Sequence, residues 1–374
     1  MAEPLKAFFS TQMVKRLGES IKAVYPAFAL TPFIRDASRG LDSLELLPRA
    51  KHIASQMAKH LPSSYPEAVD ILLRSLGPEH AGDELEGVGM GPFFYLPHTI
   101  FVAEKGLDHF DLSMNAQREL TKRFTAEFSI RFYIARYPEK TFEVFERWVR
   151  DPNPHIRRLV SEGTRPRLPW ASRVAFLDNH PERALALLEH LKDDPASLVR
   201  RSVANHLNDV GKAHPNLLVE VCTRWGKGAA PERKALIEHA LRSAVKRGEK
   251  GALQLTGHGR KAAVRAEDVR FTPKRVAIGQ KVQVTFTLRS TAEKQQSLLV
   301  DLKVHFVKKN GSTAGKVFKL TRLALEAGQT AELSKSISLA VHTTRTPYPG
   351  KHEVEALVNG QSFPLGAFEV LSGS

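Results

Sequence analysis

The chain has 374 residues, of which 42% are hydrophobic and 25% are charged, which indicates a globular protein of two-domain size rather than a disordered one. Lys and Arg outnumber Asp and Glu by 55 to 40, which gives a formal net charge of +15 and favours a polyanionic partner such as nucleic acid. The single cysteine, Cys222, excludes an intramolecular disulfide framework, and without a signal-peptide core or a run of ~18 apolar residues we expect a cytoplasmic protein with no membrane partner.

The first 250 residues or so have the periodicity of helices. Apolar residues recur at helical spacing, as Phe142, Phe145 and Val149 do in one segment and Ala184 and Leu188 do in another. Asp-Pro, Asn-Pro and His-Pro steps separate such segments, and these steps favour turns. We therefore predict short helices in series over residues 1–258.

An internal repeat runs through this helical part. Four segments align without gaps at residues 122–127, 157–162, 200–205 and 233–238, with offsets of 35, 43 and 33 residues. Each segment opens with two basic residues and has a polar residue four positions after the second of them. The period resembles that of HEAT-type repeats, whose paired helices stack into a solenoid. Because residues at i and i+4 share a helix face, Arg158 should lie beside Glu162, and Arg201 beside Asn205 and Asp209.

The basic residues of the repeat have two interpretations. If their helices line the concave wall of the solenoid, the side chains contact DNA phosphates and make the affinity dependent on salt. Alternatively, they form ion pairs within and between repeats. The sequence does not fix the rotation of each helix, so both interpretations stay open. Four basic pairs in register on a chain of this charge favour the phosphate wall. The predicted phosphate contacts are Lys122, Arg157, Arg158, Arg200 and Arg201.

From about residue 271 the pattern changes to the two-residue period of strands. Val282, Val284, Phe286 and Leu288 alternate with polar residues, and residues 301–320 have the pattern of two strands joined by an Asn-Gly turn. Short strands at this spacing are typical of a small β-sandwich, predicted for residues 271–374 after a linker at 259–270. From residue 261 onward the chain holds 17 Lys and Arg but only 9 Asp and Glu. This excess predicts a second DNA contact.

Several segments resemble a known family. RRLVSEGTRPRLPW (157–170), RRSVANHLNDVGKAHP (200–215), RELTKRFTAEFSIRFYI (118–134) and the opening MAEPLKAFFS are similar to the AlkC branch of bacterial DNA alkylation-repair glycosylases. The similarity covers about residues 1–255, and an immunoglobulin-like C-terminal domain occurs in one subgroup of that family. The resemblance implies a mainly α fold, a HEAT-like α-α helical repeat solenoid followed by a small immunoglobulin-like β-sandwich.

The same resemblance implies an activity. Enzymes of this family are monofunctional DNA glycosylases that hydrolyse the N-glycosidic bond of cationic alkylated bases, notably 3-methyladenine and 3-methylcytosine, in double-stranded DNA for base excision repair. They use no metal or cofactor, and they are thought not to flip the base into a tight pocket, unlike most base-modifying enzymes.

Three acidic residues carry over from the family motifs as catalytic groups: Glu127, Glu162 and Asp209. A cationic base becomes neutral as it leaves, so it needs little protonation, and the demand falls on the sugar, which develops oxocarbenium character. A carboxylate close to C1′ stabilises that charge, and a carboxylate also orients or deprotonates the attacking water. The sequence chemistry therefore agrees with the role that the resemblance implies.

Glu162 precedes Gly163, which we expect to end a helix. The helix dipole disfavours a carboxylate there, so compensation is expected from a nearby cation or from the cationic substrate. The nearby candidates are Arg158, Arg165 and Arg167. In the alternative interpretation Glu162 simply pairs with Arg158, and the other two acids are ordinary solvated helix charges.

The loop that follows Glu162 supplies further candidates. Trp170 matches the aromatic residue of the family motif and is predicted to lie against deoxyribose or a base edge; alternatively it packs in a turn between repeats. Arg165 and Arg167 lie in the same proline-bounded loop and are predicted phosphate contacts, with solvated loop charge as the alternative.

Motifs for other chemistries do not occur. The sequence contains no His-Glu-x-x-His, no Cys/His cluster and no phosphate-binding loop, so we predict no metal and no cofactor, and we expect a monomer. The competing hypothesis is a non-catalytic HEAT-like module that binds DNA structures or proteins. It predicts that the acidic residues are dispensable, whereas the enzyme hypothesis predicts lost turnover with DNA affinity spared.

Overall fold

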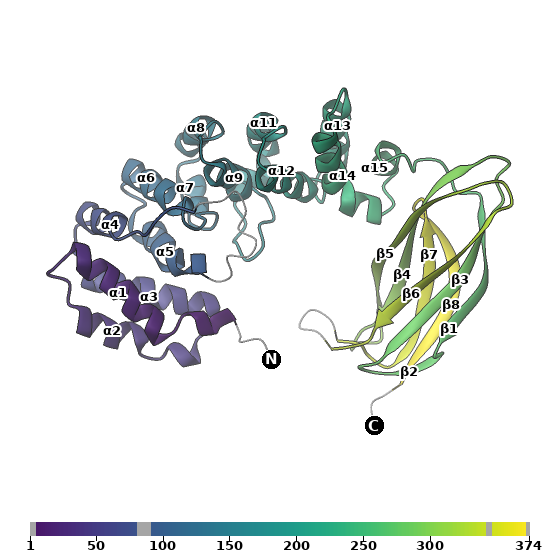
Figure 1. The fold of residues 1–374 in the computed structure, drawn as a ribbon, viewed down its shortest axis with the longest axis horizontal. Helices are drawn as coiled ribbons and strands as arrows, with labels where there is room; N and C mark the ends of the chain where they lie inside the picture. The colour runs from purple at the N-terminus through teal and green to yellow at the C-terminus, as the bar shows by residue number, and fades with distance from the viewer. Residues whose placement is uncertain (1–4, 81–90, 342–345, 372–374) are drawn as a thin grey trace. The chain divides into compact units, whose positions relative to one another are not determined.

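The computed structural model describes residues 5–80, 91–341 and 346–371, so residues 1–4 of the opening motif lie outside it. Helices in series are followed by β-sheets (Figure 1), which confirms the predicted helical-repeat solenoid with an immunoglobulin-like domain after it. The helices are α1 (Thr11–Val24), α2 (Leu30–Ser38), α3 (Leu46–His60), α4 (Tyr65–Arg74), α5 (Leu96–Lys105), α6 (Phe110–Thr121), α7 (Ile130–Arg136), α8 (Pro138–Trp148), α9 (Pro154–Gly163), α10 (Ala175–Asn179), α11 (Pro181–Leu191), α12 (Ser197–Val210), α13 (Pro215–Gly226), α14 (Pro231–Lys246) and α15 (Lys250–Leu255). Within the described ranges, none is long and apolar enough to cross a membrane.

Proline sets where several helices begin. Pro138, Pro154 and Pro181 occupy the first turn of α8, α9 and α11, where the missing N–H has no intrahelical partner to lose. The residue before each proline has non-helical backbone angles, as the proline ring requires. Asn153 also caps α9 by accepting a hydrogen bond from the N–H of His155. The structure therefore has turns at the predicted Asn153-Pro154 and His180-Pro181 steps.

Helix α9 lies at the centre of its neighbours and packs against α6, α8, α11 and α12. Its apolar face, including Ile156 and Leu159, is fully buried. Gly163 ends the helix, as predicted. A Cβ at Gly163 would lie 2.7 Å from Cγ2 of Ile130, so glycine allows the start of α7 to approach the end of α9. This approach brings the turn before α7 next to Glu162.

Arg157 and Arg200 hold turns together. Arg157 donates to both carboxylate oxygens of Asp194, over 2.6 and 2.9 Å, and to two carbonyl oxygens of its own turn. Arg200 donates to the carbonyl oxygens of Asp194 and Pro195 in the same way. The ion-pairing alternative thus holds for Arg157, and both residues make structural contacts, while their DNA contacts remain predictions.

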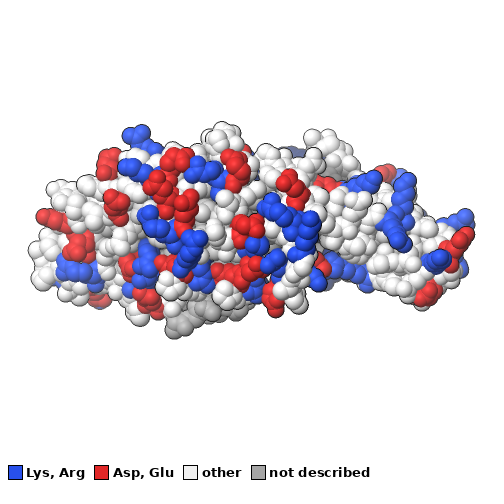
Figure 2. Space-filling view, turned by 90° about the horizontal axis from the view of Figure 1, so that it is seen from above, with Lys and Arg blue, Asp and Glu red and all other residues white. Residues whose placement is uncertain are grey.

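The first aligned segment, residues 122–127, does not open a helix, because α6 continues to Thr121 and the segment forms the turn before α7. Lys122 follows the last turn of α6 and pairs with Glu119 over 2.8 Å and with Glu79 over 3.2 Å. Lys122 therefore forms ion pairs within the protein, and its phosphate contact remains a prediction. Basic and acidic side chains are also intermixed on the face drawn in Figure 2, as expected where charges pair across helices.

Replacing Asp194 with Ala is expected to lower the free energy of unfolding by about 3 kcal/mol. The substitution removes the partner of the Arg157 charge, and Asp194 Oδ1 also accepts the N–H of Ala196 in the turn before α12. Denaturant unfolding measures the loss. Asp193→Ala is the matched control, because Asp193 forms exposed ion pairs that contribute only about 0–1 kcal/mol. Equal losses in the two variants would contradict this role for Asp194.

The strands form two sheets, with orders β1-β3-β6 and β2-β8-β7-β4-β5. Their bounds are β1 (Val264–Thr272), β2 (Arg275–Ala277), β3 (Lys281–Ser290), β4 (Gln296–Val307), β5 (Thr313–Leu325), β6 (Thr330–Ser338), β7 (Gly350–Val358) and β8 (Gln361–Leu371). Val282, Val284, Phe286 and Leu288 of β3 are buried in one core together with the inward side chains of β4, β7 and β8. The predicted alternation of β3 is therefore correct.

The predicted linker at 259–270 is too long, because β1 begins at Val264. Asp268 has a φ of 52°, and the pairing of β1 with β3 shifts between Glu267 and Arg270. This bulge breaks the two-residue alternation by which the other strands are recognised, so the sequence pattern conceals the strand.

The chain divides into two compact units, residues 1–210 with 229–240 and residues 211–228 with 241–374. The second unit contains α13 and α15 as well as the sheets. Asn359, in the turn between β7 and β8, donates a side-chain hydrogen bond to the carbonyl of Arg260 over 3.1 Å. Helices α13 and α15 therefore belong to one unit with the β-sandwich, whereas α14 is divided between the two units.

Candidate active site

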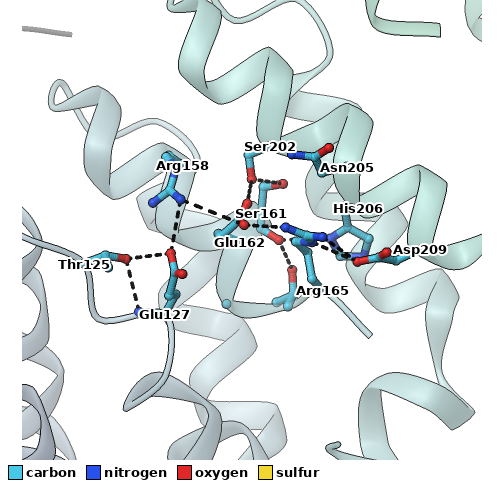
Figure 3. A network of polar contacts seen from close by, with 12 residues as sticks. Thr125, Glu127, Arg158, Ser161, Glu162, Arg165, Ser202, Asn205, His206 and Asp209 are labelled. Carbon is cyan, nitrogen blue, oxygen red and sulfur yellow. Dashed lines mark hydrogen bonds and ion pairs between the residues drawn. The ribbon is translucent and has the colours of Figure 1, made fainter. Parts of the chain in front are cut away.

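Glu127, Glu162 and Asp209 come from three different elements and share one polar network (Figure 3). Glu127 lies in the turn between α6 and α7, Glu162 in the last turn of α9, and Asp209 in the last turn of α12. Helices α9 and α12 pack against each other, and the close approach at Gly163 adds the turn that carries Glu127. The fold thus brings together the three acids that the sequence singled out.

Glu127 is oriented by its neighbours. The hydroxyl of Thr125 donates to Glu127 Oε2 over 2.9 Å and accepts the N–H of Glu127 over 3.3 Å. Arg158 Nη2 lies 3.1 Å from the same carboxylate oxygen. The prediction that Glu127 lies on a helix is wrong, because it lies in a turn. That turn nevertheless places its carboxylate in the network.

Glu162 is buried at the centre of the network, with 6% of its surface exposed. Its Oε1 accepts from Arg165 Nη1 over 2.5 Å and lies 3.9 Å from Arg158 Nη2, while its Oε2 accepts from the hydroxyl of Ser202. Burial favours a higher pKa for this carboxyl, but the charges of Arg158 and Arg165 and the Ser202 hydroxyl outweigh it and hold the pKa below its ordinary value. Glu162 is therefore ionised at neutral pH.

Arg165 joins Glu162 to Asp209. Its Nε and Nη2 lie 2.9 and 2.8 Å from Asp209 Oδ2, and the side chain of Asp209 is only 1% exposed. Burial lowers the pKa of the Arg165 guanidinium, but the two carboxylates outweigh it, and the pKa is raised. The ion pairs run in series through Glu127, Arg158, Glu162, Arg165 and Asp209. Carboxylate and guanidinium groups therefore alternate along the network.

Arg158 and Arg165 were predicted to contact phosphate, but their guanidinium groups are engaged by these carboxylates. Arg167 and Arg201 are exposed, so their phosphate contacts remain predictions.

Four polar residues of the network were missed by the sequence analysis: Thr125, Ser161, Ser202 and His206. The hydroxyls of Ser161 and Ser202 lie 3.0 Å apart, and His206 Nδ1 lies 3.0 Å from the carbonyl oxygen of Ser161, so that nitrogen donates. Burial lowers the pKa of His206 to about 4, and the ring is neutral at pH 7. A signal for Ser202 exists: it aligns with Leu159, which is fully buried, and a buried polar residue requires a partner.

A pocket of about 360 Å³ opens beside the network. Its polar wall contains Glu127, Arg158, Glu162 and Arg165. The rest of its lining is mainly apolar and aromatic: Leu47, Pro92, Phe93, Leu96, Phe124, Phe128, Leu168, Pro169 and Trp170. Asp209 is not among the described residues that line it, and it contacts this wall through Arg165. An ionised, partly desolvated cluster thus faces an aromatic cavity.

Trp170 projects from the loop beside this pocket. Trp170 is 67% exposed, and its backbone φ is 64°. This is a left-handed conformation that residues other than glycine rarely adopt. A tryptophan that packs in a turn between repeats would be buried, so the structure contradicts that alternative. An exposed aromatic in a strained backbone is instead typical of a residue that meets a ligand.

In the described parts of the chain, no group of three or more His, Cys, Asp or Glu side chains is arranged to hold an ion. The acidic residues of the network are paired with guanidinium groups instead.

The fold and the network define a helical-repeat protein with a charged, aromatic pocket and an appended immunoglobulin-like domain. Residues 265–372 match the family described as "Uncharacterised protein YhaZ, C-terminal Ig-like domain". The chain is 33% identical over 359 residues to the uncharacterized protein YhaZ of Bacillus subtilis (strain 168), covering 96% of each chain.

A solved structure is similar over the whole chain. It is the alkylpurine DNA glycosylase AlkC of Pseudomonas fluorescens, bound to DNA that contains an abasic-site analogue. It is 36% identical with a TM-score of 0.91, and the match covers 99% of this chain and 100% of that one. The chain therefore belongs to the AlkC-type family of DNA glycosylases that carry a C-terminal immunoglobulin-like domain, as its motifs implied.

Proposed function

We propose that this protein is a monofunctional DNA glycosylase that removes cationic alkylated bases, notably 3-methyladenine and 3-methylcytosine, from double-stranded DNA. The observation that carries the proposal is the ion-pair network, whose carboxylates Glu127 and Glu162 line an aromatic pocket. A cationic, planar base is complementary to both features. The whole-chain similarity to an alkylpurine DNA glycosylase supports the same activity.

The proposed chemistry needs carboxylates and water only. As the bond between C1′ and the base nitrogen breaks, its electron pair neutralises the leaving base and positive charge develops on the sugar. Glu127 and Glu162, which line the pocket, stabilise that charge. Water then attacks C1′ and gives up a proton to a carboxylate or to solvent, leaving an abasic site. Asp209 acts on this wall by fixing Arg165.

The proposed DNA contacts combine exposed cations with an aromatic residue. Arg167, Arg201 and Trp170 are exposed, and the excess of basic residues from residue 261 onward supports a second contact by the β-sandwich. Phosphate contacts of this kind make binding weaker as salt increases.

The decisive test measures free bases released from methylated duplex DNA under single-turnover conditions, by chromatography with mass spectrometry. Release of 3-methyladenine or 3-methylcytosine at a rate above the DNA-only reaction is the expected result. If DNA is bound but no methylated base is released, the protein is a binding module and the glycosylase proposal fails.

Replacing Trp170 with Ala is expected to weaken binding to abasic-site DNA by about 1–3 kcal/mol, the contribution of one aromatic stacked on a base. Because Trp170 is exposed, the melting temperature should change little. Fluorescence anisotropy of labelled duplex measures the affinity, and exposed Leu112 provides the control Leu112→Ala. Unchanged affinity in Trp170→Ala would remove this residue from the DNA interface.

A further inference from the structure

Arg131 is a buried cation that lies outside the carboxylate network. It belongs to α7 and is 4% exposed. Its Nη1 donates to the carbonyl oxygens of Gly163 over 2.9 Å and of Arg165 over 2.8 Å. Its Nε and Nη2 both donate to the carbonyl oxygen of Ser172, over 3.2 and 3.0 Å. One guanidinium group therefore donates hydrogen bonds to both ends of the segment 163–172.

This segment has little regular structure to hold it. Between the end of α9 and the start of α10 it consists of turns and bends, and it carries both Arg165 and Trp170. The left-handed backbone of Trp170 costs on the order of 1–3 kcal/mol and persists only where neighbours impose it. Arg131 supplies such a constraint, because its hydrogen bonds fix the main chain on either side of the strained residue.

The chemistry of Arg131 suits a clamp on carbonyl groups. Burial lowers its pKa to about 10, so the guanidinium is still charged at neutral pH, and hydrogen bonds from a charged donor are stronger than neutral ones. A planar guanidinium offers five donors in a fixed fork, whereas a lysine ammonium is a compact group on a flexible stem. Lysine could not reach the carbonyls at both ends of the segment with the same geometry.

We propose that Arg131 is a positioning residue of the active site, which fixes the segment 163–172 so that Arg165 stays between Glu162 and Asp209 and Trp170 stays beside the pocket. Arg131 does not line the pocket that contains the carboxylates but a neighbouring one, which Trp170 also lines. Its hydrogen bonds go to main-chain carbonyls, so it acts through the main chain of this segment. The catalytic consequence rests on the proposed glycosylase function, whereas the geometric consequence does not.

The experiment compares Arg131→Gln and Arg131→Lys with the control Arg136→Gln, an exposed arginine on the same helix. Protein labelled with 5-fluorotryptophan gives one ¹⁹F signal for each of its three tryptophans; Trp148 and Trp225 are buried and report on the fold, and Trp170→Phe identifies the third. Single-turnover base release is measured on the same samples.

In Arg131→Gln, the ¹⁹F signal of Trp170 should shift or broaden while the signals of Trp148 and Trp225 stay in place. Base release should fall about 100-fold, the effect of misplacing groups at a reacting centre by about an ångström. Arg131→Lys should recover only part of the rate, and Arg136→Gln should match the wild type in every measurement.

Two results would overturn the proposal. One is a folded Arg131→Gln variant with the wild-type Trp170 signal and the wild-type rate. The other is an equal disturbance of all three tryptophan signals in both Arg131 variants, which indicates general destabilisation. If the wild type releases no base, the glycosylase function fails, and the Trp170 signal alone still decides whether Arg131 holds the segment.

Discussion

Replacing Glu162 with Gln should lower the single-turnover rate of base release by about 10²–10³-fold, the usual effect of losing one electrostatic contact to a developing charge. The amide keeps the shape of the side chain: its oxygen can accept from Arg165, and its NH2 group can donate to the Ser202 hydroxyl, so the fold should survive. What disappears is the carboxylate charge of Glu162, which lines the pocket. A cationic base and an oxocarbenium-like sugar lose their electrostatic stabilisation.

DNA affinity should stay the same or increase in this variant, because a negative charge near phosphates is removed. The measurement pairs single-turnover release with equilibrium binding to abasic-site DNA. Glu143→Gln, on the exposed face of α8, makes the same chemical change away from the network and should leave both quantities unaltered. A Glu162→Gln variant that releases bases at the wild-type rate would assign the carboxylate to a structural ion pair, which is the alternative interpretation from the sequence.

Local patterns in the sequence were sufficient for several parts of the site. The end of α9 at Gly163 follows from a single glycine after an amphipathic segment, and the alternation of β3 follows from side-chain period alone. Arg158 and Glu162 were paired by the i,i+4 rule, yet their closest atoms lie 3.9 Å apart, whereas Arg158 lies 3.1 Å from Glu127 of a preceding turn. The rule gives the right face of the helix but not the stronger partner.

The remaining parts depend on contacts that no local pattern encodes. Arg165 reaches Asp209 from a loop, because α9 and α12 pack together. Glu127 enters the network from a turn, since α7 approaches α9 at Gly163. The carbonyl oxygens to which Arg131 donates belong to the main chain, which every residue has, so no side-chain pattern indicates these contacts. Burial also decides the charge state of His206, and burial is a property of the packed fold.

Replacing Arg165 with Met should reduce stability by about 3–5 kcal/mol, the effect of breaking a buried ion pair, and should change how the rate depends on pH. Glu162 acts as a carboxylate, so the rate is at its maximum above the pKa of this group and falls as the pH drops through it. In the wild type, Arg158 and Arg165 outweigh the effect of burial and keep that pKa below its ordinary value. The wild-type rate should therefore persist into acid, below the usual range of a glutamic acid.

Without Arg165, burial of Glu162 remains while part of the opposing charge is gone, so the pKa of Glu162 rises and the acid limb of the rate moves to higher pH. The depressed pKa of Glu162 also stabilises the fold. This contribution is present above the pKa of Glu162 in the unfolded chain and is lost as the pH falls through its pKa in the folded protein, so in Arg165→Met it is lost at a higher pH. Single-turnover rates across acid and neutral pH measure the shift, with Arg136→Met as the control because Arg136 is an exposed arginine outside the network. An acid limb that stays where it is in Arg165→Met would mean that a group other than Glu162 controls the reaction.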